Sequence, residues 1–449
     1  MATYQIQKGF DLKIAGKAEA KIADAPEPVL VAVDTAEFPG IKPKALVQEG
    51  DRVKTGQPLF LDKLDRERMF CAPATGVVKQ VVFGERRFLQ RVVIEVAAKE
   101  EFHQGERLDV RAATREQAIV ALERSGLWPL VRQRPLGTIA DPAKVPVAIY
   151  VNGMDTEPLA ADPAFATQGR KVDLQAGVDL LKKLTGGKVH LTLQAGAGHQ
   201  DELRSLQGVE LHEFSGPHPS GLVGTHISRI QPLRITEVAW YLKAQEVALL
   251  GEWLRTGRYP AKRVVAVAGS MAPSRQYFRI RQGAALATLS GHRPVQGDVR
   301  VINGTVLSGM ATDPTGFLGF YNHTVTFIPE GTGQRDLFGW ALPHFGKLSA
   351  SRAVFSWLAP RREYEVDARL NGGHRPIVNI GAWESVTPLD IHPAYLVRAI
   401  QANDLEEAVK LGLLEVTEED VALCTVVDPC KIDVGEVIRS GLELYVKEG

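Results

Sequence analysis

Three histidines lie close together in the sequence, around a loop rich in glycine and proline. They are His212, His218 and His226, and the loop is SGPHPSGLVGTH, residues 215–226. An imidazole can ligate a metal ion or exchange hydrogen bonds with a ligand. The spacings of six and eight residues across a turn match no usual zinc pattern, and no cysteine stands nearby. The sequence therefore predicts no metal site here and leaves His218 and His226 as candidate hydrogen-bond donors.

The main chain is expected to shape this loop. Gly216, Gly221 and Gly224 can adopt backbone angles that are closed to other residues, and the two prolines restrict φ. Functional loops use the same residue types as ordinary connections. Two interpretations stay open. The three glycines with His218 and His226 form a ligand contact or a subunit interface, or the loop only connects two elements.

Chemistry based on cysteine has little support in the sequence. The chain has three cysteines, Cys71, Cys424 and Cys430, which cannot form a disulfide framework and are typical of a reducing compartment. An iron–sulfur cluster needs four thiolates, so we expect this chain alone to bind none. The motifs HExxH, CxxC and GxSxG do not occur in the sequence. Metalloprotease, thioredoxin-like and hydrolase functions therefore lose their main support.

Two segments come close to known cofactor motifs. Gly196-Ala-Gly198-His-Gln-Asp201 follows an expected strand, but Asp201 stands where the third glycine of a dinucleotide fingerprint belongs. A carboxylate there would bring negative charge to a pyrophosphate, so we do not expect NAD binding. Lys63 lies near the place where lipoyl and biotinyl domains present a modified lysine. The segment LDRERM after it is longer and more charged than a carrier hairpin, so Lys63 is expected to be a solvated surface residue.

Composition indicates a globular protein of several domains. A length of 449 residues exceeds what one core can organise and predicts three or four domains. The 53 basic residues balance the 53 acidic ones, so no net field favours nucleic acid or an anionic membrane. No signal peptide is evident, and no apolar run approaches the roughly 18 residues that cross a bilayer. The chain itself is expected to be cytosolic, whether free or seated on a membrane protein.

Hydrophobic patterns in the first part of the chain predict two folding units. Residues 1–104 contain short β-rich runs such as VLVAV and GVVKQVVF in two similar halves, which resemble the barrel-sandwich of lipoyl and biotinyl carrier domains. Residues 105–258 alternate strands such as KVHLTLQ with helical segments. This alternation predicts a Rossmann-like, doubly wound sheet, whose ligands bind at the carboxyl ends of the strands. The fold class is thus α/β plus β, in several domains.

The remaining residues predict three further regions. Residues 259–330 contain short runs such as QYFRIR and DVRVING, typical of a small mixed β module. Residues 331–387 are rich in aromatic residues, glycine, proline and arginine and are expected to form an extended connection. Residues 388–449 are expected to form a C-terminal helical bundle. Its last helix has an apolar stripe of Val434, Val437, Ile438, Leu442 and Tyr445.

A series of segments, in order along nearly the whole chain, resembles one known family. The segments are KGFDLKIAG, GIKPKALVQEGDRVKTGQPLF, APATGVV, SGPHPSGLVGTH, NGTVLSG, LNGG, PLDI and LEVTEEDVALCT. They resemble the A subunits of the bacterial sodium-translocating NADH:quinone reductases. The chain departs from that pattern at Asp428, where the family usually has a second cysteine, and at Cys430, where a glycine is expected. This departure puts any redox or metal role of that cysteine pair in doubt.

The resemblance implies a place in a six-subunit membrane complex that oxidises NADH, reduces ubiquinone and exports sodium. The chain would be peripheral, on the cytoplasmic face of the bacterial inner membrane, without a transmembrane segment. It would dock chiefly on the membrane subunit NqrB, beside NqrC, NqrD, NqrE and NqrF, and the flavins and the iron–sulfur centre would belong to those partners. This chain would bind no redox cofactor, and alone it would be inactive.

The family is also similar in domain order to the flavin-binding subunit of respiratory complex I and to the C subunit of the Rnf complex. That similarity implies that residues 259–330 form a β-grasp module of the SLBB type. It also implies that the C-terminal helical domain, which holds a cluster in those relatives, is present here without one. This fold expectation rests partly on analogy.

Three functions follow as hypotheses. In the first, the chain contributes to quinone reduction or docking, with ubiquinone as its ligand, His218 and His226 as donors, and apolar surface from Trp240, Trp253 and residues 338–358. In the second, it is a scaffold without quinone contact, and the same loop makes a subunit interface. In the third, it is a free-standing enzyme using NAD or a carrier lysine, which the near-match fingerprint and the long segment after Lys63 disfavour.

Overall fold

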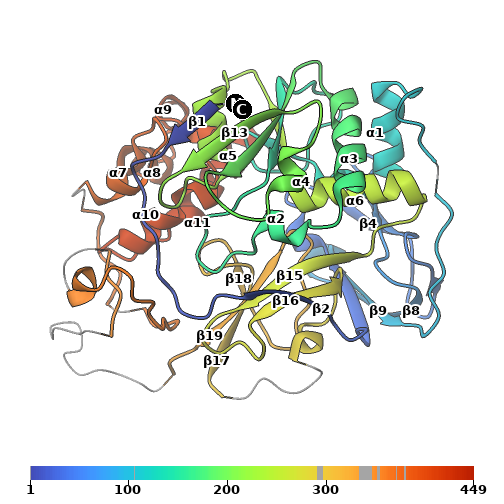
Figure 1. Ribbon diagram of the computed structural model, residues 1–449, viewed down its shortest axis with the longest axis horizontal. Coiled ribbons are helices and arrows are strands. Elements are labelled where there is room, and N and C mark those ends of the chain that lie inside the picture. Colours follow the sequence, from blue (N-terminus) through green and yellow to red (C-terminus); the bar gives the residue numbers. More distant parts are fainter. Residues whose placement is uncertain are drawn as a thin grey trace.

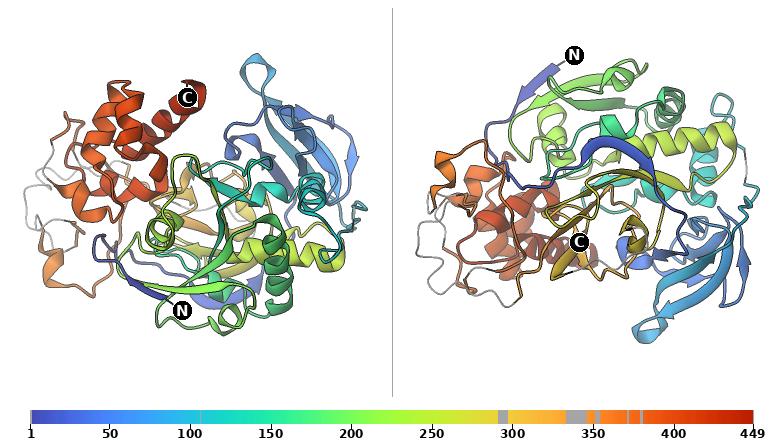
Figure 2. Two further views of the ribbon diagram at one scale, coloured as in Figure 1. Left: turned by 90° about the horizontal axis from the view of Figure 1, so that it is seen from above. Right: turned by 60° about the horizontal axis from the view of Figure 1, so that its bottom comes forward.

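The chain folds into the predicted combination of α/β and β units with a C-terminal group of helices. The computed structural model describes residues 2–105, 107–290, 297–332, 346–350, 354–370, 372–378 and 381–448. The β-rich N-terminal unit and the C-terminal helices lie at opposite ends, with two six-stranded sheets between them (Figures 1 and 2). The fold class predicted from the sequence is therefore confirmed.

The N-terminal unit is a sandwich of two small antiparallel sheets. Their strand orders are β3-β9-β8-β5 and β4-β6-β7. Alternating residues point inward, and the rings of Phe60 and Phe70 stack between the sheets with their centroids 4.6 Å apart. The strands are β3 (Leu30–Asp34), β4 (Pro43–Ala45), β5 (Arg52–Val53), β6 (Pro58–Asp62), β7 (Met69–Cys71), β8 (Gly76–Phe83) and β9 (Leu89–Val96).

The second unit is a doubly wound sheet with strand order β1-β13-β12-β11-β14-β10, parallel except at β10. Every residue of β11 is buried, as expected for a strand covered on both faces. The elements are β1 (Ala2–Gln5), α1 (Arg115–Arg124), β10 (Arg132–Arg134), β11 (Ala148–Asn152), α2 (Pro163–Ala166), α3 (Lys171–Leu184), β12 (Lys188–Gln194), α4 (Asp201–Arg204), β13 (Glu210–Ser215), α5 (Val223–Ile230), β14 (Ala239–Lys243) and α6 (Ala244–Thr256).

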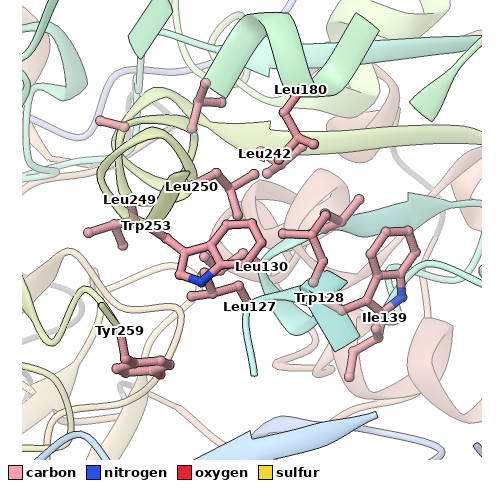
Figure 3. Close-up of a cluster of buried hydrophobic side chains, with 14 of the residues drawn as sticks. Leu127, Trp128, Leu130, Ile139, Leu180, Leu242, Leu249, Leu250, Trp253 and Tyr259 are labelled. Atoms are coloured by element: carbon pink, nitrogen blue, oxygen red, sulfur yellow. The ribbon is translucent and has the colours of Figure 1, made fainter. Parts of the chain in front are cut away.

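Helices cover both faces of this sheet. On one face, α5 packs through Val223 and Ile227 on Tyr150 and Tyr241. On the other, α3 and α6 pack on alternate residues of the same strands, and this cluster continues into the N-terminal unit (Figure 3). Trp240 and Trp253 both belong to this core and are almost fully buried. Trp240 thus lies inside the core, and Trp253 borders a cavity of about 330 Å³ beside the N-terminal unit rather than the loop 215–226.

The third unit is a sheet of order β18-β17-β19-β15-β16-β2. Its elements are β2 (Glu19–Asp24), β15 (Lys262–Ala268), β16 (Gln276–Arg281), β17 (Val299–Asn303), β18 (Met310–Thr312) and β19 (Thr324–Pro329). The first 24 residues thus contribute β1 to the second unit and β2 to the third, and this segment runs between the two sheets (Figure 1). The unit boundaries expected at 104, 258, 330 and 387 stay predictions.

The C-terminal helices pack around their own apolar cluster. They are α7 (Ala382–Val386), α8 (Pro393–Gln401), α9 (Leu405–Lys410), α10 (Ala422–Val427) and α11 (Val434–Glu448). Val434, Ile438 and Leu442 are buried on one side of α11, which confirms the predicted stripe. Among the described helices, none is both long and apolar enough to cross a membrane. Within the expected connection 331–387, the residues outside the described part of the chain are 333–345, 351–353, 371, 379 and 380. They include 338–345 and 351–353 of the expected aromatic surface.

The close approach of α3 and α6 depends on two glycines. A Cβ at Gly251 would lie 1.8 Å from the carbonyl oxygen of Asp173, and one at Gly177 would lie 2.2 Å from that of Val247. Main-chain atoms cannot yield as a flexible side chain does.

We predict that Gly251→Ala lowers the free energy of unfolding by about 1–3 kcal/mol, because overpacking forces the two helices apart. Urea denaturation of the full chain measures the effect. Gly186→Ala is the control, because a Cβ at Gly186 meets nothing within 4 Å. Equal stabilities of the two variants would contradict the argument.

Candidate functional site

A pocket of about 200 Å³ lies at the carboxyl ends of the parallel strands in the second unit. Asn152 at the end of β11 and Lys243 at the end of β14 line it, together with Gly221, Leu222 and Val223 of the loop after β13. The third unit closes one side with Ser308 and Tyr321, and the helical unit closes another with Thr417, Glu418, Glu419 and Arg439. The pocket thus occupies the place where doubly wound sheets bind ligands.

Glycine is required in the loop because the chain passes close to three neighbours. Gly216 has φ +124°, and a Cβ there would lie 2.1 Å from the carbonyl oxygen of Ile6. At Gly221 a Cβ would lie 2.6 Å from the amide of Thr156, and at Gly224 it would lie 2.3 Å from Oδ1 of Asp420. The loop is therefore pressed against the N-terminal segment, the connection after β11 and the helical unit.

The ring of His226 is buried and forms two hydrogen bonds within the chain. Its Nδ1 lies 3.1 Å from the hydroxyl of Thr192, and its Nε2 lies 2.9 Å from the carbonyl oxygen of Ser220. A carbonyl oxygen only accepts, so Nε2 carries the proton and Nδ1 accepts from the threonine. Burial lowers the pKa of His226 to about 3, which keeps the ring neutral. Both nitrogens are engaged, so in this conformation His226 has no donor to offer a ligand.

His218 holds the other side of the loop. Its Nδ1 lies 3.2 Å from the hydroxyl of Thr156, and its main-chain amide donates to Asp11 Oδ1 at 2.9 Å. Burial lowers the pKa of His218 to about 4. Its Nε2 has no hydrogen-bond partner among the described residues. The part of the loop that lines the pocket is Gly221–Val223. The two histidines lie outside this lining, and their hydrogen bonds hold the loop in place.

Lys243 and two carboxylates form the charged floor of the pocket. Lys243 Nζ lies 3.2 Å from Asp155 Oδ2. Burial disfavours the charged amine, but Asp155 and Glu157 outweigh this effect and raise the pKa of Lys243. Glu157 Oε2 accepts from Thr305 and Ser308 at 2.9 and 2.8 Å. Burial, reinforced by Asp155, raises the pKa of Glu157 to about 7.

Two arginines complete the site. The guanidinium of Arg132 lies between the rings of Tyr241 and Tyr321, 4.6 and 4.8 Å from their centroids. Arg134 donates to Asp420 Oδ2 at 2.5 Å and to Glu419 Oε1 at 2.7 Å. Arg134 thereby joins the second unit to the helical unit beside the pocket.

The sequence did not single out these charged residues. Lys243 ends a buried strand and begins a helix, a position that signals the carboxyl edge of a parallel sheet. Arg132, Glu157 and Glu419 have no such local signal, because chain segments far apart in the sequence bring them together. A lysine, an arginine and a tyrosine hydroxyl can donate hydrogen bonds to a small polar head group, and Glu157 can exchange a proton near neutral pH.

The other candidate residues lie elsewhere. Lys63 is exposed in the turn between β6 and β7. Cys71, Cys424 and Cys430 are buried and free, and the thiol of Cys424 lies 3.3 Å from the hydroxyl of Thr387. His212 is on β13, where its Nε2 lies 2.9 Å from Nδ1 of His190.

Three family models match the chain in order. Residues 4–97 match the NqrA N-terminal barrel-sandwich hybrid domain, residues 113–259 the NqrA second alpha/beta domain, and residues 264–313 the SLBB model described as the NQRA C-terminal domain. These matches confirm the predicted barrel-sandwich, α/β and SLBB-like units.

Two relatives are similar over their whole length. The A subunit of the Na(+)-translocating NADH-quinone reductase from Yersinia pestis bv. Antiqua (strain Angola) is 40% identical over 448 residues, 99% of this chain and 100% of that protein. The protein of the same name from Histophilus somni (strain 129Pt) is 40% identical over 447 residues, 99% of each chain. A solved NAD+-reducing NiFe-hydrogenase aligns over 79% of this chain and 67% of that chain at 14% identity, with a TM-score of 0.35. That score is too low to support an argument.

We predict that Arg134→Ala lowers the free energy of unfolding by about 3–5 kcal/mol, because it leaves the buried Asp420 without its ionic partner. Chemical denaturation followed by circular dichroism measures this loss. Lys410→Ala is the matched control, since its pair with Glu406 is exposed and screened by water, so its loss should change stability little. An Arg134→Ala loss no greater than that of the control would refute the role of this ion pair.

The pKa of Glu157 also predicts a pH effect on stability. Between its ordinary value of 4.5 and about 7, the folded state holds a proton that the unfolded state has released. Stability therefore falls as pH rises through this window and levels off above it. Glu157→Gln removes the fall, so this variant should gain stability over the wild type at pH 8 relative to pH 5. Urea midpoints at both pH values test this, with the exposed Glu406→Gln as control; parallel profiles for Glu157→Gln and wild type would contradict it.

Proposed function

This chain belongs to the family of A subunits of the Na(+)-translocating NADH-quinone reductase, and from that premise we propose that it contributes to quinone reduction as a peripheral subunit. The observation that supports this proposal is the 40% identity to the Yersinia pestis protein over 99% of the chain. The subunit would lie on the cytoplasmic face of the bacterial inner membrane and dock chiefly on NqrB. Flavins and the iron–sulfur centre would belong to partner subunits, and this chain would use none of its own.

Within this role, the pocket at the carboxyl ends of the strands is the proposed contact for ubiquinone. A quinone presents two carbonyl oxygens, which need donors, and a flat ring, which needs apolar walls. Lys243, Arg132 and Tyr241 supply the donors, and Leu222 and Val223 supply wall. A volume of about 200 Å³ is below that of pockets enclosing drug-sized ligands, about 300–1,000 Å³. The pocket therefore suits the head group, and the isoprenoid tail would extend toward the membrane subunit.

Glu157 fits the proton chemistry of this step. Reduction of a quinone to a quinol takes up two electrons and two protons. Glu157 borders the pocket, and its pKa of about 7 allows it to release and regain a proton at neutral pH. In the proposal, electrons arrive from the partner subunits, and Glu157 serves as a proton donor beside the head group.

The loop 215–226 favours a second function, that of a scaffold without quinone contact. His226 uses both ring nitrogens inside the chain, and Gly224 abuts the helical unit at Asp420. Such a loop stabilises the arrangement of the units whether or not a ligand enters the pocket. The scaffold and the quinone site differ in what they predict for Lys243.

We predict that Lys243→Met in the assembled enzyme lowers the rate of ubiquinone reduction by about 10- to 100-fold, since a charged donor to a buried oxygen contributes about 1.5–3 kcal/mol. NADH oxidation with an artificial acceptor should stay at the wild-type rate. Lys243→Arg, which keeps a charged donor, should retain part of the activity, and Lys63→Met, at an exposed lysine of the first unit, is the control.

The decisive comparison is between quinone reduction and assembly. If Lys243→Met co-purifies normally with the partner subunits and reduces ubiquinone at the wild-type rate, the quinone site is refuted and the scaffold function is left.

A further inference from the structure

Two histidines and a glutamate share one face of the parallel sheet, near the amino ends of β12 and β13. In the register of these strands, His190 pairs with Glu210 and Thr192 pairs with His212. Paired residues of parallel strands point to the same side, as do residues two apart on one strand. The side chains of His190, Glu210 and His212 therefore converge on the face that α5 covers. The pocket lies at the other ends of these parallel strands.

The three side chains are close enough to hold one ion. His190 Nδ1 lies 2.9 Å from His212 Nε2 and 3.8 Å from Glu210 Oε2. One ligand atom from each residue lies within 4.8 Å of the others. Around a tetrahedral zinc ion with bonds of 2.0–2.2 Å, ligand atoms are roughly 3.3 Å apart. The separations of 2.9 and 3.8 Å bracket this value, and side-chain rotation of the half-exposed Glu210 would bring its carboxylate into the set.

The two imidazoles are in the form that ligates metals. Both are more than nine-tenths buried. Burial, reinforced by the neighbouring His212, lowers the pKa of His190 to about 4, and burial also lowers the pKa of His212. Both rings are therefore neutral at pH 7, with a lone pair available for an ion.

A hydrogen bond between the rings leaves polar atoms without partners. A neutral pair shares one proton between the inner nitrogens His190 Nδ1 and His212 Nε2. The outer nitrogens, His190 Nε2 and His212 Nδ1, have no partner among the described residues. A bound ion would use both inner lone pairs, and each ring would then carry its proton on the outer nitrogen. The two inner nitrogens thus offer a site for one ion, which would take the place of the proton that the rings share.

Glu210 provides the third ligand and the route of entry. Its side chain is 46% exposed, and its two oxygens face different neighbours. Oε1 lies 2.6 Å from Lys188 Nζ, and Oε2 faces His190. Lys188 thus orients the carboxylate, while its positive charge opposes a cation nearby.

We propose that His190, Glu210 and His212 bind a divalent transition-metal ion, which by its ligand set is Zn²⁺. Two imidazole nitrogens and one carboxylate oxygen are ligands that zinc prefers, and a water fills the fourth position. The ion ties β12 to β13 next to the edge strand β1, whose Tyr4 ring lies 6.0 Å from that of His212. The site lies at the opposite ends of the strands from the proposed quinone pocket and does not depend on it.

Titration of the full chain with ZnCl₂ against a chromophoric chelator tests the site, and Co²⁺ serves as the spectroscopic probe. We expect one tight equivalent of Zn²⁺ and visible Co²⁺ bands typical of tetrahedral nitrogen and oxygen ligands. His190→Gln and His212→Gln should each weaken Zn²⁺ binding at least tenfold. His103→Gln, which changes an exposed histidine in another part of the chain, is the matched control and should leave binding unchanged.

A second variant keeps the test decisive if the buried substitutions impair folding. Lys188→Met alters an exposed side chain and removes the charge that opposes the ion, so Zn²⁺ should bind several-fold more tightly. The proposal is overturned if the wild type binds no tight equivalent, if both folded histidine variants bind like the wild type, or if Lys188→Met leaves the affinity unchanged.

Discussion

The arrangement of this chain depends on a buried ion pair between two units that are distant in sequence. Arg134, on the edge strand of the doubly wound sheet, donates to Asp420 of the helical unit, 286 residues later. Oδ2 of Asp420 also accepts from the main-chain amide of Thr417, and Oδ1 lies against Gly224 of the glycine loop. One carboxylate therefore connects a strand, a loop and a helix start. Two charges removed from water are stabilised only when their geometry is good, so the contact tolerates little displacement.

The N-terminal segment, residues 2–24, is the second contact that holds the units together. Residues 2–5 extend the doubly wound sheet beside β13, and residues 19–24 extend the third sheet beside β16. Between these strands, the amide of Phe10 donates to the carbonyl oxygen of His218, and Asp11 accepts from the His218 amide. The loop 215–226 thus contacts the N-terminal segment, the connection after β11 and the helical unit. This explains why its sequence is dominated by glycine, proline and buried imidazoles.

The two ends of the parallel sheet have different chemistry. At the carboxyl ends, Lys243, Arg132 and carboxylates from the second and the helical unit surround a small polar pocket. Toward the amino ends, His190 and His212 are neutral and lie against aromatic rings. Charges are tolerated at the first end because opposite charges and solvent lie close by, whereas burial of the two imidazoles favours their neutral form.

Local patterns in the sequence determined the elements and the fold class. The segment KVHLTLQ predicted a strand, and β12 spans the same residues, because its apolar residues alternate with polar ones at the period of a strand. At the start of α1, Thr114 and Gln117 form a capping box, another pattern that depends only on residues close in sequence. The motif string around 215–226 identified the family, since such a string is specific even where its conformation is unknown.

The tertiary structure alone decided which residues meet. Thr192 and Ser220 engage His226, and Arg132, Glu157 and Glu419 come to one pocket from two units. The contact between His190 and His212 follows from strand register, which places them diagonally on one face, whereas the spacing of the histidines along the chain argued against a metal site. Periodicity reports which face of an element is apolar, and it carries no information about the partner that covers that face. Such partners are set by long-range packing, which is why the sequence could name the loop and its family but not the pocket.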